Sequence, residues 1–104
     1  MGTVKPLKLS DHSFTKMLRA IAVDSDRVVL TKHAKKRMKQ RRISLAQVLV
    51  CLRKGQIVEP AHMTIQGDWK ATVEHHYAGD AVRVSVVIER AEDGDLAVVV
   101  TVME

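Results

Sequence analysis

The first half of the chain carries apolar residues at helical spacing. Between Asp11 and Asp24 they recur every three or four positions, which predicts a helix that Ser10 or Asp11 caps. The apolar positions of this helix are Phe14, Met17, Leu18, Ile21 and Ala22. Val28 to Leu30 follow as a short apolar link or strand.

Two further helices are predicted before Gly55. Thr31 is placed to cap the first of them, in which a thin apolar stripe runs along one face. That stripe consists of Ala34, Met38 and Ile43. Ser44 caps the next helix and Gly55 ends it. The buried stripe of this last helix is expected to be Leu45, Val48, Leu49 and Leu52.

From Gln56 onward the apolar period shortens from helical to alternating, which predicts strands. Residues 56–60 indicate a short strand that Pro60 ends, and longer strands follow at 70–77, 81–90 and 96–103. Glycine-containing turns at 78–80 and 91–95 favour an antiparallel meander. We therefore expect one α+β domain over residues 1–104, with two to three N-terminal helices packed on one face of an antiparallel sheet of about four strands.

The composition limits the available chemistry. Cys51 is the only cysteine, which excludes an intramolecular disulfide and a cysteine-based metal cluster and fits a reducing cytoplasm. No apolar run approaches the roughly 20 residues that span a bilayer, so we expect a cytoplasmic protein that does not enter membranes. The chain lacks a Walker loop, a dinucleotide fingerprint and an HExxH pair. His75 and His76 point to opposite faces of a regular strand, and no metal or cofactor is expected.

Positive charge is concentrated in one short segment. Of the 17 basic residues, seven lie between Lys32 and Arg42, a stretch without any acid. The other ten face twelve acids, so the rest of the chain carries −2 while the whole carries +5. A focused basic patch attracts polyanions, because phosphate contacts supply most non-specific affinity for nucleic acid. The alternative is a solvated helix face, or one paired with acids from Glu89, Glu92 or Asp93.

His33, Arg37 and Arg41 share one face of the basic helix at four-residue spacing. An imidazole with a pKa of about 6.5 can take a proton from a ribose 2′-hydroxyl. An adjacent guanidinium can stabilise the charge that develops on the phosphate. These groups are the minimum for metal-independent RNA cleavage. A structural histidine that donates one hydrogen bond is the alternative reading of His33.

Strand residues supply further candidates on alternation alone. His76, Arg83 and Thr101 fall on the more polar faces of their strands, where a surface facing a substrate could form. Tyr77 is a weaker candidate from the same reasoning. His75 and Tyr77 alternate with Val73, so both are expected in the core or at its rim.

The segment LTKHAKKRMKQRRIS, residues 30–44, resembles the opening signature of the bacterial family called domain of unknown function 4258. The matching residues are Thr31, His33, Ala34, Arg37, Met38, Arg41, Ile43 and Ser44. Arg42 stands where glycine is usual, so the bend before Ser44 is made without glycine. The resemblance extends over residues 28–103, through a helix that ends in Gly55 to Val-rich strands that carry Thr101.

The resemblance implies a fold similar to the RelE and barnase-like group of small ribonuclease toxins, with helices packed on an antiparallel sheet of about four strands. It implies that His33, Arg37 and Arg41 are the catalytic or phosphate-contacting set, with Thr101 on the last strand facing them. Fold similarity does not transfer chemistry by itself.

Three functions remain open from the sequence. The first is an RNA-binding domain with metal-independent endoribonuclease activity, in which His33, Arg37 and Thr101 are catalytic. The residues expected to contact RNA or another phosphate polyanion are Lys32, Lys36, Arg37, Arg41, Arg83 and His76. The second is a nucleic-acid-binding module without catalysis. The third is a module of the toxin–antitoxin type whose basic helix meets an acidic protein partner.

Overall fold

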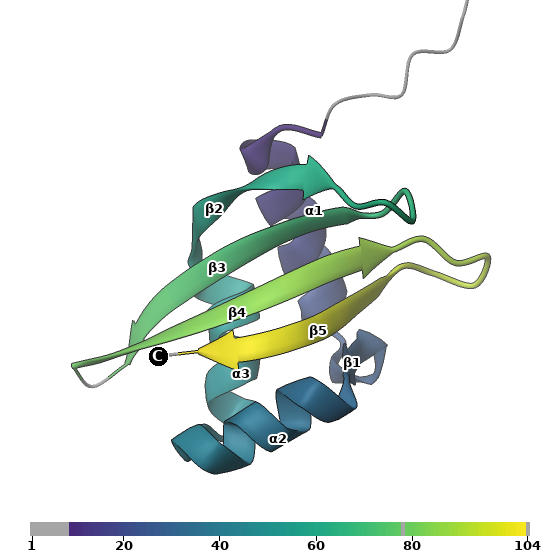
Figure 1. The fold of residues 1–104 in the computed structure, drawn as a ribbon. Coiled ribbons are helices and arrows are strands. Elements are labelled where there is room, and N and C mark those ends of the chain that lie inside the picture. The colour runs from purple at the N-terminus through teal and green to yellow at the C-terminus, as the bar shows by residue number, and fades with distance from the viewer. Residues whose placement is uncertain (1–8, 78, 104) are drawn as a thin grey trace, which may run out of the picture.

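The structure is a computed structural model that describes residues 9–77 and 79–103 (Figure 1). The helical elements are α1 (Asp11–Ala22), the 3-10 helix η1 (Ser25–Arg27), α2 (Lys32–Arg41) and α3 (Leu45–Lys54). The strands are β1 (Val28–Leu30), β2 (Gln56–Met63), β3 (Trp69–Tyr77), β4 (Asp80–Glu89) and β5 (Leu96–Met103). The expected domain and the expected turn at 78–80 include residues outside the described ones, as does the side chain of Tyr77.

The five strands form one mixed sheet in the order β1-β5-β4-β3-β2. Strands β2 to β5 pair antiparallel, as predicted, while β1 pairs parallel with β5 at one edge. The α+β class with N-terminal helices is confirmed, but the expectation of about four antiparallel strands is wrong. The fifth strand is Val28 to Leu30, whose partners Ala97 to Val99 lie far along the chain. No local turn signal connects the two segments, so periodicity could not reveal the pairing.

Pro60 does not end its strand. β2 runs on to Met63, with irregular register between Ile57 and Glu59 and again between Glu59 and His62. An edge strand tolerates proline at such a bulge because the missing N–H is not needed in a ladder. The prediction that the strand stops at Pro60 was wrong for this reason.

Helices α1 and α3 pack on one face of the sheet, and buried residues of α2 complete the core. In Figure 1, α1 and α3 lie behind the sheet, and the face towards the viewer carries no helix. The fully buried side chains come from both layers and include Phe14, Leu18, Val48, Leu52, Val73, Val84, Val86, Val99 and Val102. In α3 the buried residues are Val48, Cys51 and Leu52. Of the predicted stripe, Leu49 is only half-buried and Leu45 in the first turn is 48% exposed, so their predicted burial is wrong. α1 ends at Ala22, two residues early, because the Asp24 side chain caps η1.

A bulge in β5 shifts the alternation of its side chains between the two faces of the sheet. Ser85 pairs with Thr101, and Val86 pairs with Val99, so Val100 is the extra residue. Val99 and Val102 are therefore both buried although three positions separate them. Thr101 lies on the helix-free face of the sheet, across from Ser85.

Candidate functional site

Thr31 fastens α2 to the edge of β5. Its backbone N–H donates to the Val99 carbonyl at 3.2 Å, and its hydroxyl donates to the Val100 carbonyl at 3.0 Å. The same hydroxyl oxygen accepts from the Ala34 N–H at 3.1 Å, which makes Thr31 the predicted N-cap. Since β1 pairs only as far as Val99, α2 packs along the rest of β5 (Figure 1).

The inner side of α2 is apolar and narrow, as the sequence predicts. Ala34, Met38 and Ile43 are all buried against the domain. The helix ends at Arg42, which adopts the left-handed conformation (φ 56°, ψ 41°), so an arginine makes the bend before Ser44. Its N–H and that of Ile43 point back to carbonyls of the last helical turn. A side chain in this conformation costs about 1 kcal/mol, and this strain lies inside the basic segment.

The outer side of α2 carries the predicted set of charged residues. His33, Lys36, Arg37 and Gln40 line a hollow of about 140 Å³, called here the α2 hollow. His33 and Lys36 are exposed and Arg37 is half-buried. The structure thus brings together His33, Arg37 and Lys36, as helical spacing predicts. Lys32 and Arg41 are exposed at the two ends of the same helix.

The two cations that line the α2 hollow are Lys36 and Arg37. Neither Lys36 nor Arg37 forms an ion pair with a described carboxylate. Glu89, Glu92 and Asp93, the acids that the sequence offered as partners, do not neutralise them. The α2 hollow therefore keeps the positive charge of Lys36 and Arg37.

Thr101 and the two strand candidates lie apart from the α2 hollow. Thr101 is half-buried on the helix-free face, next to the Val100 carbonyl that accepts from Thr31, and it does not line the hollow. Arg83 and His76 lie on β4 and β3, where both contact Glu74. The predicted residues therefore fall into two groups, one on α2 and one around Glu74, and Thr101 belongs to neither.

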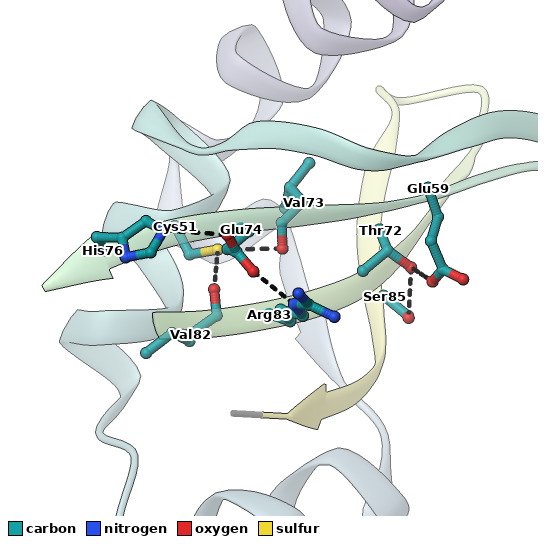
Figure 2. A network of polar contacts seen from close by, with 9 residues as sticks. All are labelled: Cys51, Glu59, Thr72, Val73, Glu74, His76, Val82, Arg83 and Ser85. Atoms are coloured by element: carbon teal, nitrogen blue, oxygen red, sulfur yellow. Dashed lines mark hydrogen bonds and ion pairs between the residues drawn. The ribbon is translucent and has the colours of Figure 1, made fainter. Parts of the chain in front are cut away.

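Glu74 is the centre of the second group (Figure 2). The Arg83 Nε–H donates to Glu74 Oε2 at 2.5 Å, and His76 Nε2 lies 3.1 Å from Glu74 Oε1. The hydrogen bond from Arg83 is the main reason that the pKa of Glu74 is lowered, and His76 acts in the same direction. The carboxylate is thus ionised and its two oxygens are oriented by two different side chains.

A larger hollow of about 360 Å³ adjoins this group and is called here the corner hollow. It is lined by Lys54, Gln56, Val58, Glu74, His75 and His76. β2 begins opposite Glu74, so the edge of β3 beyond that residue has no neighbouring strand. This open edge explains why two adjacent histidines on opposite faces border the same hollow.

Sequence reasoning missed Glu74 and Lys54 as members of a site. The signal for Glu74 was the short turn after Tyr77, because an antiparallel hairpin that pairs Tyr77 with Asp80 also places Glu74 opposite Arg83. Lys54 carried no such signal, since only the turn from α3 into β2 brings it beside β3.

A row of hydroxyl groups crosses the helix-free face beside this group (Figure 2). The Thr72 hydroxyl donates to the Glu59 carboxylate, which can only accept, so Ser85 must donate to Thr72 across their 2.9 Å contact. The row explains how Thr72 and Ser85 are buried with their hydrogen bonds satisfied.

Three other classes of site find no support in the described residues. No group of three or more His, Cys, Asp or Glu side chains there is arranged to hold a metal ion. Burial raises the pKa of the Cys51 thiol from 9.0 to about 12, which leaves it unreactive at neutral pH. None of the described helices combines the length and apolar character that crossing a membrane requires.

A family model described as Domain of unknown function (DUF4258) matches residues 30–104 of the chain. The chain therefore belongs to this family, which confirms the resemblance that the basic segment carries. No curated protein and no solved structure matches the chain significantly. The likeness to RelE and barnase-like toxins stays a prediction.

Proposed function

We propose that this member of the DUF4258 family binds RNA in the cytoplasm through the basic surface of α2, which consists of Lys32, His33, Lys36, Arg37 and Arg41. One observation carries the proposal: Lys36 and Arg37 border a hollow together with His33 and have no acidic partner in the described chain. Like charges at helical spacing repel one another, and bound phosphate relieves that repulsion.

The spacing of the surface supports a strand of phosphates as the ligand. His33, Arg37 and Arg41 follow one another at about 6 Å along the helix axis, close to the separation of successive phosphates in a single strand. RNA is chosen over DNA because the His33 imidazole is exposed beside two cations, where it can contact a 2′-hydroxyl. The predicted likeness to RelE and barnase-like ribonuclease toxins also favours RNA.

Cleavage of the bound strand is a second candidate function, favoured by the same exposed imidazole. In this reaction His33 takes the 2′-hydroxyl proton, and the oxygen attacks the adjacent phosphorus. The 5′-oxygen leaves with a proton from Lys36, and a 2′,3′-cyclic phosphate remains on the upstream fragment. Arg37 stabilises the added negative charge. This mechanism uses no metal ion.

Binding is tested by fluorescence anisotropy with single-stranded RNA across a range of salt concentrations. We expect the double variant Lys36→Glu, Arg37→Glu to lose affinity on the order of 100-fold at low salt and to show a shallower salt dependence. The matched control is Lys16→Glu, Arg90→Glu, which changes the net charge equally at exposed positions on α1 and after β4. Equal losses in both double variants would show that only net charge matters and would reject the α2 surface.

Cleavage is tested separately, in EDTA, with free and ribosome-bound RNA. We expect wild-type protein to yield cyclic phosphate ends. His33→Ala should lose only a small part of its RNA affinity, because the cations of the surface remain, but it should no longer cut RNA. RNA with a single 2′-deoxy nucleotide should resist cleavage at that position. Equal cleavage by both proteins, or none by either, removes the enzymatic candidate and leaves the binding function untouched.

A further inference from the structure

The corner hollow lies where α3 turns into β2 against the backbone of β3. Gly55 makes this turn, and a Cβ atom there would lie 2.4 Å from the Cys51 carbonyl oxygen and 3.0 Å from that of Glu74. The Arg19 side chain donates to the Gly55 carbonyl at 3.3 Å and holds the turn from the other side. Lys54 and Gln56, which flank Gly55, are therefore held at the open edge of β3.

The groups around this hollow differ in chemistry and come from the end of α3, the start of β2 and the end of β3. Lys54 contributes a cation, Gln56 an amide, and His75 and His76 two imidazole rings. The Glu74 carboxylate accepts one hydrogen bond from Arg83 and one from His76. Because a carboxylate has about four acceptor sites, two remain for a ligand.

We propose that the corner hollow binds one nucleoside monophosphate, with guanine as the preferred base. The base lies against the imidazoles of His75 and His76, its Watson–Crick edge meets Glu74, and the phosphate meets Lys54. The site is separate from the basic surface of α2 and does not rest on the RNA-binding proposal.

The volume and the rings favour a nucleotide over a bare anion. At about 360 Å³ the hollow is larger than a phosphate ion needs and falls within the roughly 300–1,000 Å³ of small-molecule sites. Histidine rings are among the side chains on which unstacked bases stack. Lys54 adds the positive charge that a phosphate requires, while Arg83 neutralises Glu74 so that the carboxylate does not repel it.

The carboxylate selects among the bases because it only accepts hydrogen bonds. Guanine presents two neighbouring donors, N1–H and the 2-amino group, which match the two oxygens of Glu74. Adenine and cytosine each present one amino group beside a ring nitrogen that accepts, and uracil presents one N–H between two carbonyls. Each of these would bring a lone pair against the carboxylate, so they bind less well.

Arg83 is a positioning residue in this proposal. It bonds Glu74 from β4, while the hollow lies on the other side of β3. Its loss should let the carboxylate rotate, so that discrimination between bases falls more than affinity for the phosphate. A merely structural role would lower both equally.

The test is a titration followed by the histidine ring signals in ¹H–¹³C spectra. Guanosine monophosphate should shift the signals of His75 and His76, leave that of His33 in place, and bind about tenfold more tightly than adenosine monophosphate. Guanosine without phosphate and inorganic phosphate alone should both bind more weakly. Absence of shifts at His75 and His76, or equal affinities for the two nucleotides, would overturn the proposal.

Variants separate the parts of the site. The single variants Glu74→Gln and Arg83→Gln should each abolish the preference for guanine. Lys54→Gln should lower the affinity for guanosine monophosphate to that for guanosine. Arg90→Gln is the matched control, because Arg90 also pairs with a carboxylate, that of Asp95, outside the hollow. If the preference survives in Glu74→Gln, the base is not read by this carboxylate and the proposal is wrong.

The α2 double variant distinguishes this site from the proposed RNA surface. Lys36→Glu, Arg37→Glu should bind guanosine monophosphate as the wild type does, even where it no longer binds RNA. Nucleotide binding that disappears in this variant, with shifts confined to His33, would place the ligand on α2 and reject the corner hollow.

Discussion

Basic residues occur in two regions of this protein that differ in their acidic partners. The first, called here the unpaired setting, is the α2 surface with Lys36 and Arg37. The second, called here the paired setting, is the ion pair of Arg83 with Glu74. On α2, the exposed Lys36 and the half-buried Arg37 have no acidic partner in the described chain, whereas on the sheet Arg83 donates to the Glu74 carboxylate. Unpaired cations create a field that attracts any phosphate chain but reads no sequence. A paired arginine gives up that field and fixes the direction of an acceptor instead, which allows one base to be chosen over another. In the two proposals, this difference separates affinity for a phosphate chain from selectivity for one base.

The largest expected effect concerns Gly55, at the turn from α3 into β2 beside Glu74. Gly55→Ala should lower the free energy of unfolding by about 3 kcal/mol, because the new Cβ meets two backbone oxygens that have no room to move. The folded fraction should lose nucleotide binding while α2 still binds RNA. Urea unfolding and the two titrations measure this. A loss of stability below about 1 kcal/mol would show that the corner is looser than described.

The second prediction concerns Thr31, which joins α2 to β5. Thr31→Val should cost about 2 kcal/mol, since both the cap of α2 and the hydrogen bond to the Val100 carbonyl are lost. Ser44→Ala is the control, because Ser44 caps α3 without contacting the sheet, and it should cost about 1 kcal/mol. Thermal or urea unfolding compares the two. Equal costs would mean that the bond to Val100 contributes nothing.

The third prediction gives Lys36 and Arg37 an acidic partner on α2. Gln40→Glu places an acid three residues from Arg37 and four from Lys36, within reach of both on the helix surface. RNA affinity should fall about threefold to tenfold, while stability rises by a few tenths of a kcal/mol. Gln66→Glu, at an exposed position between β2 and β3, adds the same charge elsewhere. The proposal fails if both variants lose affinity equally.

The smallest effect is the pH dependence of the paired setting. The pKa of Glu74 is lowered from 4.5 in the folded protein, so its ionisation stabilises the fold above that pH and is lost as the pH falls through the lowered value. Wild-type protein should therefore lose more stability on acidification than Glu74→Gln. Arg83→Gln should resemble Glu74→Gln, because it removes the hydrogen bond that lowers the pKa. Urea midpoints at neutral and acidic pH measure the difference, and parallel curves for all three proteins would contradict it.

Helical periodicity predicted almost all of the arrangement of α2. Thr31 caps α2, Ala34 and Met38 are buried, and His33 and Arg37 border one hollow, because residues four apart on a helix are neighbours whatever the rest of the fold does. Alternation likewise placed Val73 and Val84 inside and Arg83 outside. It did not reveal the pairing of β1 with β5, and it failed at Pro60 and at the bulge of Val100, where a local irregularity decides the outcome.

By itself, the sequence determined the family, the α+β class and the charged face of α2, since all three depend on residues close together in the chain. Only the tertiary structure decided which strand lies beside β5, that Thr31 bonds to the bulge, and that Lys54 joins Glu74 and two histidines around one hollow. Those contacts join segments about 20 to 70 residues apart. Their formation depends on the packing of the whole core, which no local pattern of residues encodes.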